Sequence, residues 1–114
     1  MNLFALDGQF IRYGVESGLI VNQQVDGIGE AQGVRFLCPR CFAQNGGRAG
    51  THSIVCWSAA RGVPANAGPS AGRWTLLGTG LSDLTLAGEN GGTGLINLGV
   101  GCGWHGTINN GEVS

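Results

Sequence analysis

Glycine constrains the fold of this chain more than any other residue type. It supplies 23 of the 114 residues, and these glycines follow no Gly-X-Y repeat of the kind found in collagen. Glycine at this density weakens helices and favours turns and bulges between short strands. A chain of this length forms one domain with a modest core, which a cross-link would help to stabilise. We therefore predict a mainly all-β fold, with residues 1–114 forming a single small domain of short antiparallel strands.

Local patterns predict where the strands lie. The stretch 9–15 alternates as a strand does, whereas 16–33 reads as a loop with one short strand at 19–21. Further strands are expected within 34–37, 51–59, 73–80, 81–88 and 95–101, with a loop over 61–72, a turn over 89–94 and one short helical turn. Asn110-Gly111 between two β-prone pieces predicts a type I′ hairpin at the end of the chain.

Two short motifs supply pairs of potential metal ligands. Cys38 and Cys41 lie in FLCPRCF, and Cys102 and His105 lie in CGWH, each pair separated by two residues. In a zinc knuckle the chain turns tightly after the first thiolate, and Pro39 and Gly103 suit such turns. Together the pairs give a closed Cys3His set, in which soft thiolates favour Zn²⁺. We therefore predict that a pair of zinc knuckles clips the two ends of the β-domain together.

A cytoplasmic location, which the sequence predicts, is consistent with cysteines that bind a metal. No stretch resembles a signal peptide or a membrane span, because the opening MNLFALDGQF has neither a basic segment nor a continuous apolar run. We therefore expect a cytoplasmic protein, in which cysteines stay reduced and favour metal sites or chemistry over disulfides.

His52 and Cys56 in THSIVCW form a second candidate site. Residues four apart share a face of a strand as well as of a helix, so the two side chains could act together. They could form another metal site or a nucleophile–base pair, or His52 alone could be a general base. Alternatively, Cys56 is a core residue and His52 a hydrogen-bonded histidine where a strand begins. His52 follows a glycine-rich loop, where catalytic and binding groups are common.

Asp83 and the three tryptophans leave further alternatives open. Asp83 could orient His52 as its carboxylate partner, or it could cap a turn in GTGLSDL. Trp104, inside the second knuckle, would shield the metal from water. Trp57, Trp74 and Trp104 together form either part of the core or an exposed binding face, and we predict that at least two belong to the core.

Charge weighs against nucleic acid as the partner. Only 11% of the residues are charged and the net charge is −1. All the basic residues are arginines, and they are scattered rather than arranged in a stripe that could follow a phosphate backbone.

Linked motifs over residues 30–114 resemble a family of small phage and prophage proteins. These motifs are EAQGVRFLCPRCF, NGG, GTHSIVCW, GVP, GRW, GTGLSDLTL and GCGWHGTINNGEV. Some members carry the name ammonia monooxygenase, although a small Cys3His domain lacks the membrane and copper apparatus which that name implies. More distant relatives accompany bacterial genes for ubiquitin-like conjugation.

The resemblance implies the same ligand set, Cys38, Cys41, Cys102 and His105. It also matches His52 within Thr-His-Ser and Asp83 within the GTGL stretch, whereas Cys56 is less characteristic of the family. The segment AGENGGTG departs from the proline-containing version expected there. The resemblance implies a phage-encoded product in the cytoplasm of a bacterial host and brings no known reaction with it.

Three functions follow from these observations. The first is a zinc-stabilised domain that binds a host or phage protein, for example in counter-defence. The second is a small hydrolase-like enzyme in which His52 is the base and Asp83 orients it. The third is a nucleic-acid binder with a face like that of a zinc ribbon. A saturated Cys3His site has no open position for water, so the sequence favours the first function over an enzyme.

Overall fold

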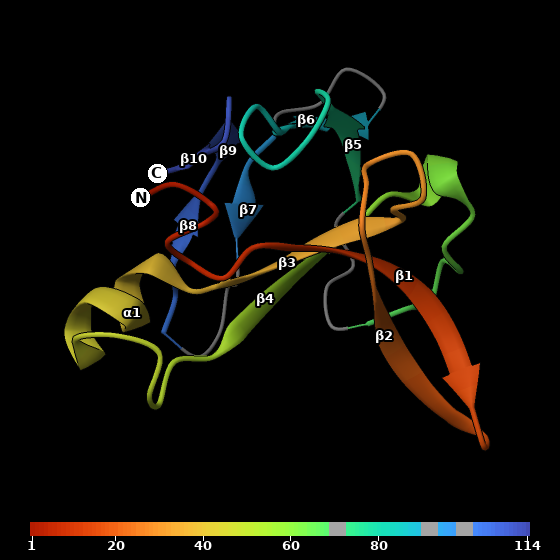
Figure 1. Cartoon of the computed structure of the whole chain (residues 1–114), viewed down its shortest axis with the longest axis horizontal. Helices are drawn as coiled ribbons and strands as arrows, with labels where there is room; N and C mark the ends of the chain where they lie inside the picture. The colour runs from red at the N-terminus through yellow and green to blue at the C-terminus, as the bar shows by residue number, and fades with distance from the viewer. Residues whose placement is uncertain (69–72, 90–93, 98–101) are drawn as a thin grey trace.

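The computed structural model of the chain describes residues 1–68, 73–89, 94–97 and 102–114 (Figure 1). The elements in chain order are β1 (Gln9–Glu16), β2 (Leu19–Val25), β3 (Gly33–Leu37), α1 (Pro39–Asn45), β4 (Ser53–Trp57), the 3₁₀ turn η1 (Ala59–Arg61), β5 (Trp74–Leu77), β6 (Thr85–Gly88), β7 (Ile96–Asn97), β8 (His105–Gly106), β9 (Ile108–Asn109) and β10 (Glu112–Val113). Short antiparallel strands dominate, which confirms the predicted mainly all-β fold.

The largest unit is a four-stranded antiparallel sheet in the order β2-β1-β3-β4. β1 and β2 are joined by a two-residue turn in which Ser17 and Gly18 have φ of 50° and 80°. Such left-handed turns match the twist of an antiparallel pair. The predicted strand at 19–21 therefore lies in a longer strand, and the expectation of a loop over the rest of 16–33 is wrong for residues 22–25, for Glu16 at the end of β1 and for Gly33 at the start of β3. Sequence patterning missed this extension because no residue of β2 is fully buried.

Both faces of this sheet carry apolar side chains. On one face, Val34, Phe36 and Ile54 join the main core, which also takes in residues of the amino-terminal loop and of the later strands. On the other face, Ile11 and Trp57 belong to a second, smaller cluster. Adjacent residues along a strand point to opposite faces, so one short sheet supports both clusters.

The carboxy-terminal half forms three two-stranded sheets, β5–β6, β7–β8 and β9–β10. The predicted type I′ hairpin is confirmed: Asn110 and Gly111 have φ of 51° and 79° between β9 and β10. Of the predicted strand at 95–101, the structure contains β7. Residues 98–101, 69–72 of the predicted loop and 90–93 of the predicted turn lie outside the described part of the chain.

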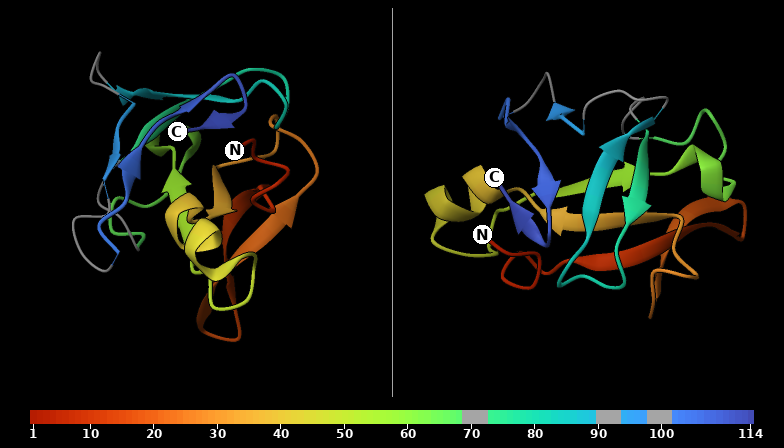
Figure 2. Two further views of the ribbon diagram at one scale, coloured as in Figure 1. Left: turned by 90° about the vertical axis from the view of Figure 1, so that its left-hand side faces the viewer. Right: turned by 90° about the horizontal axis from the view of Figure 1, so that it is seen from above.

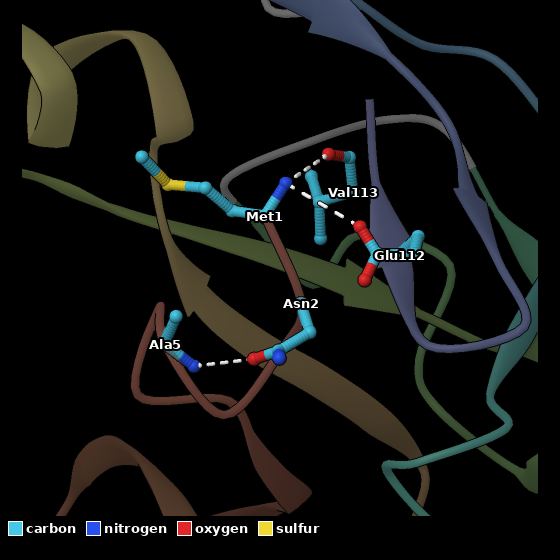
Figure 3. A network of polar contacts seen from close by, with 5 residues as sticks. All are labelled: Met1, Asn2, Ala5, Glu112 and Val113. Atoms are coloured by element: carbon cyan, nitrogen blue, oxygen red, sulfur yellow. Dashed lines mark hydrogen bonds and ion pairs between the residues drawn. The ribbon is translucent and has the colours of Figure 1, made fainter.

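The first residues run beside the last strand, which brings the two chain ends together (Figures 1 and 2). Figure 3 shows the Met1 ammonium group donating to the carbonyl oxygen of Val113 at 3.2 Å and lying 3.5 Å from a carboxylate oxygen of Glu112. The loop that follows is held by the side chain of Asn2, which accepts from the N–H of Ala5 at 2.8 Å. These contacts fix the terminal hairpin against the amino-terminal loop.

All three tryptophans are buried, with Trp57, Trp74 and Trp104 exposing 1%, 4% and 6% of their surface. The prediction that at least two of them belong to the core is confirmed. In the parts of the chain that the structure describes, no helix has the length and apolar character needed to cross a membrane.

Candidate metal centre

The first knuckle combines the end of β3 with the start of α1. Cys38 is the N-cap of α1 and is extended, with Pro39 in the first turn of the helix, where its missing N–H costs nothing. The N–H of Phe42 donates to the carbonyl oxygen of Cys38 at 2.9 Å, which closes the turn. Cys41 therefore follows Cys38 by about one helical turn, and both sulfur atoms face the same side.

β-sheet register places His52 beside this knuckle. The β3–β4 pairing ends with Leu37 opposite Ser53, and the N–H of Cys38 then donates to the carbonyl oxygen of His52 at 3.0 Å. Residues opposite each other in an antiparallel pair project to the same face, so the Cys38 and His52 side chains are neighbours. The preceding loop folds back on the end of α1: the side-chain amide of Asn45 donates to the hydroxyl oxygen of Thr51 at 3.2 Å.

The core holds Cys102 against the same site. Two residues after Cys102, the buried Trp104 ring meets Phe36 of β3 edge-to-face, with centroids 6.1 Å apart at 79°. Phe36 in turn lies two residues before Cys38. The Arg40 guanidinium of α1 also donates to the carbonyl oxygen of Cys102 at 2.9 Å. One aromatic contact and one hydrogen bond thus join the two distant motifs.

The potential ligand atoms of Cys38, Cys41, His52 and Cys102 lie within 4.8 Å of one another. The Sγ atoms of Cys38 and Cys102 are 3.6 Å apart, and Nε2 of His52 is 3.4 Å from Sγ of Cys102. A tetrahedral ion with bonds of about 2.3 Å to sulfur and about 2.0–2.1 Å to nitrogen requires S···S and S···N separations of about 3.8 and 3.6 Å. This Cys3His cluster could therefore hold a metal ion with little movement.

The cluster corrects the predicted ligand set at one position. Cys38, Cys41 and Cys102 come together as expected, but the imidazole beside them belongs to His52, and His105 is not in the cluster. His105 lies in β8 opposite Asn97, and its side chain is exposed. Because Trp104 points into the core, the next residue along an extended chain points away from it. Gly103 turns the chain after Cys102 with φ of 70°, but the chain then enters β8 at His105, so the two-residue spacing does not bring His105 to the cluster as the helical turn brings Cys41 beside Cys38.

Hydrogen bonding lowers the thiol pKa of Cys102, whereas desolvation raises that of Cys41. The backbone N–H of Trp104, followed by His52 and the other two thiols, lowers the pKa of Cys102 to about 6. This N–H···S contact is the one that a knuckle turn is expected to provide, and Gly103 allows it with φ of 70°. Desolvation, with smaller effects of Cys102 and Cys38, raises the pKa of Cys41 to about 11.

Metal binding should therefore weaken as the pH falls. At neutral pH the metal-free protein carries a thiolate at Cys102 and a protonated Cys41, so an incoming ion must displace at least the Cys41 proton. We expect affinity to fall at least about tenfold per pH unit between pH 8 and 6, and more steeply below pH 6, where Cys102 is also protonated. Competition with a chromogenic chelator across this range measures the slope, and an unchanged affinity would contradict the assignment of the thiols.

Cys56 and Asp83 have structural positions. Cys56 is fully buried in the main core, and burial raises the pKa of its thiol, which fits the core alternative rather than a nucleophile. Oδ1 of Asp83 accepts from the N–H groups of Thr79 and Gly80, both at 2.9 Å, and the Thr79 hydroxyl donates to Oδ2 at 2.9 Å. The Thr79 N–H, the largest contribution, holds the pKa of Asp83 below its usual range. Asp83 thus caps the turn between β5 and β6.

The proposed base and its orienting carboxylate do not meet. His52 contacts the Cys102 sulfur, while both oxygens of Asp83 are occupied within their own turn, and no hydrogen bond joins the two residues. A small surface recess of about 130 Å³ beside the β3–β4 pair includes Arg35, Arg48 and Ser53 but neither His52 nor Asp83. His52 and Asp83 therefore do not form the hydrogen-bonded pair that the hydrolase hypothesis requires.

No protein-family model, curated protein or solved structure matches this chain. The resemblance to small phage and prophage proteins therefore stays a prediction.

Proposed function

We propose that the cluster of Cys38, Cys41, His52 and Cys102 binds one Zn²⁺ as a structural site, and that the domain acts by binding another protein. The observation that carries the zinc assignment is the convergence of three thiols and one imidazole to within 4.8 Å. Thiolate sulfur excludes the hard ions Mg²⁺ and Ca²⁺ as natural occupants, and a Cys3His set is a common structural environment for Zn²⁺.

A structural role follows from the origin of the ligands. They come from the start of α1, from the residue before β4 and from the segment between β7 and β8, so one ion would tie together regions far apart in sequence. Four protein ligands complete a tetrahedron and leave no position for a reactive water. Structural zinc sites supply roughly 10–16 kcal/mol of apparent binding free energy, which is substantial for a domain of this size.

The proposal of protein binding follows from the weakness of the two alternatives, catalysis and nucleic-acid binding. With His52 serving as a ligand and Asp83 capping a turn, the hydrolase hypothesis loses both of its catalytic residues. The low charge and scattered arginines favour a protein partner over nucleic acid. Together with the family resemblance, this leads us to propose an accessory protein that acts on a host or phage protein in the bacterial cytoplasm.

Metal analysis of the purified protein tests the zinc site. We expect one zinc per chain by elemental analysis, and replacement by Co²⁺ should give the absorption bands of tetrahedral, thiolate-rich coordination. A folded preparation that contains no zinc and binds none would refute the site. Crosslinking in phage-infected host cells, with the Cys102→Ser variant as control, tests for a protein partner, whereas salt-sensitive binding to DNA or RNA would favour a nucleic-acid function instead.

A further inference from the structure

The β1–β2 hairpin projects from the body of the protein, at the end of the sheet opposite α1 (Figures 1 and 2). Its tip exposes three large apolar side chains: Val15, Leu19 and Ile20 are 60%, 69% and 66% exposed. Five of the seven residues in β2 are exposed and none is buried. Exposed apolar residues grouped at one end of a sheet are typical of interaction surfaces.

β2 is also an edge strand without the usual protection. It is the outermost strand of its sheet, and within the described residues its only backbone pairing is with β1. Monomeric proteins protect such edges with charged side chains, proline or a bulge. The sequence of β2, LIVNQQV, contains no charged residue and no proline, and its seven residues pair with β1 in unbroken register. Its outer edge is therefore free to pair with another strand.

We propose that the occupant of this edge is β2 of a second copy of the chain, in an antiparallel pair centred on Asn22. The two-fold axis would place Asn22 opposite Asn22 of the second copy, so that the two amides can exchange hydrogen bonds. Leu19 would lie opposite Val25 of the second copy, once on each side of the axis. These apolar pairs stabilise antiparallel strands. Because β2 is uncharged, no like charges face each other anywhere along the pair.

The resulting dimer joins two four-stranded sheets into one continuous sheet, and it is closed because the two-fold pairing uses the β2 edge of both copies. Two paired strands of seven residues bury less surface than the roughly 1,200 Å² of a stable protein interface. The dimer is consequently a weak one, and it dissociates on dilution. This inference does not depend on the zinc site, which lies at the other end of the sheet.

The position of Asn22 on the two-fold axis provides a sharp test. Asn22 is exposed and lies opposite Tyr13 in β1, so Lys or Glu can replace it without disturbing the monomer. In the dimer, Asn22→Lys would place two ammonium groups opposite each other, and Asn22→Glu two carboxylates. Sedimentation velocity over a wide micromolar concentration range should show that the wild-type chain dimerises, that each variant alone is monomeric, and that an equimolar mixture of the two variants dimerises again.

Two further measurements define the interface. Leu77→Lys, which replaces an exposed apolar residue in β5, should dimerise as the wild type does. Hydrogen exchange in residues 19–25 should slow with increasing wild-type concentration and not with increasing concentration of Asn22→Lys. Circular dichroism and zinc content should be unchanged in all the variants. A wild-type chain that stays monomeric at the highest concentration, a variant that dimerises alone, or open-ended polymers instead of a dimer would each overturn the proposal.

Discussion

Replacing His52 with alanine is expected to weaken zinc binding by about two to three orders of magnitude, whereas replacing His105 should leave it intact. His52 contributes the only imidazole of the cluster, while His105 lies in β8 with an exposed side chain. If the four ligands share the roughly 10–16 kcal/mol of a structural site about equally, one ligand supplies about 3–4 kcal/mol, or two to three orders of magnitude in affinity. Zinc titration in competition with a chelator measures both affinities.

The chain contains two histidines, so these substitutions form a matched pair. Cysteine offers a similar comparison, because Cys102→Ser should lose zinc, whereas Cys56→Ala in the core should keep it at some cost in stability. Thermal unfolding at a fixed zinc concentration should show that zinc stabilises the His105 variant more than the His52 variant. Loss of zinc from His105→Ala together with its retention by His52→Ala would instead support the ligand set expected from the CGWH motif.

Replacing Trp104 with alanine should remove about 3–5 kcal/mol from the free energy of unfolding, even with the protein saturated with zinc. The ring is 6% exposed and packs edge-to-face on Phe36, and this contact holds the segment that carries Cys102. The substitution should therefore also weaken zinc binding, because the Cys102 sulfur is no longer positioned in advance. Urea unfolding in excess zinc measures the first effect, and chelator competition measures the second.

Two other variants separate packing from positioning. Trp104→Phe keeps an aromatic ring against Phe36 and should lose less of both stability and affinity. Trp74→Ala removes a ring that is 4% exposed but distant in sequence from every ligand, so it should lower stability while leaving zinc affinity in the folded protein near that of the wild type. Equal affinities for Trp104→Ala and Trp74→Ala would show that Trp104 does not position Cys102.

Local sequence patterns predicted the thiols of the cluster because a two-residue spacing brings two side chains together when the chain between them forms a helical turn. Cys38 and Cys41 belong together because Pro39 starts a helical turn between them, which requires no knowledge of the rest of the fold. The same spacing in CGWH does not bring its two ends together, because no helical turn follows Cys102: the chain turns once at Gly103 and then enters β8 at His105. The CGWH motif therefore predicts His105 for the imidazole of the cluster, whereas the structure places His52 there.

One pattern in the sequence could have identified His52. If the segments 33–37 and 53–57 are paired as antiparallel neighbours in the register that buries Phe36 opposite Ile54, His52 falls opposite Cys38. A shift of one residue would move the apolar side chains to the wrong face, so burial selects this register. Strand patterns by themselves do not show which strands pair, so the sequence alone does not place His52 beside the cysteines.

The sequence by itself determined the all-β character of this protein, the hairpin at Asn110-Gly111 and the three thiols that meet in the Cys3His cluster. Each of these depends on interactions between residues close together in the chain, such as left-handed turns and a single helical turn. The tertiary structure alone decided that His52 completes the metal cluster, that Asp83 caps a turn, and that β2 forms an exposed edge. These features depend on sheet register and on the contact between Trp104 and Phe36, which join residues distant in sequence through burial of apolar surface in a shared core.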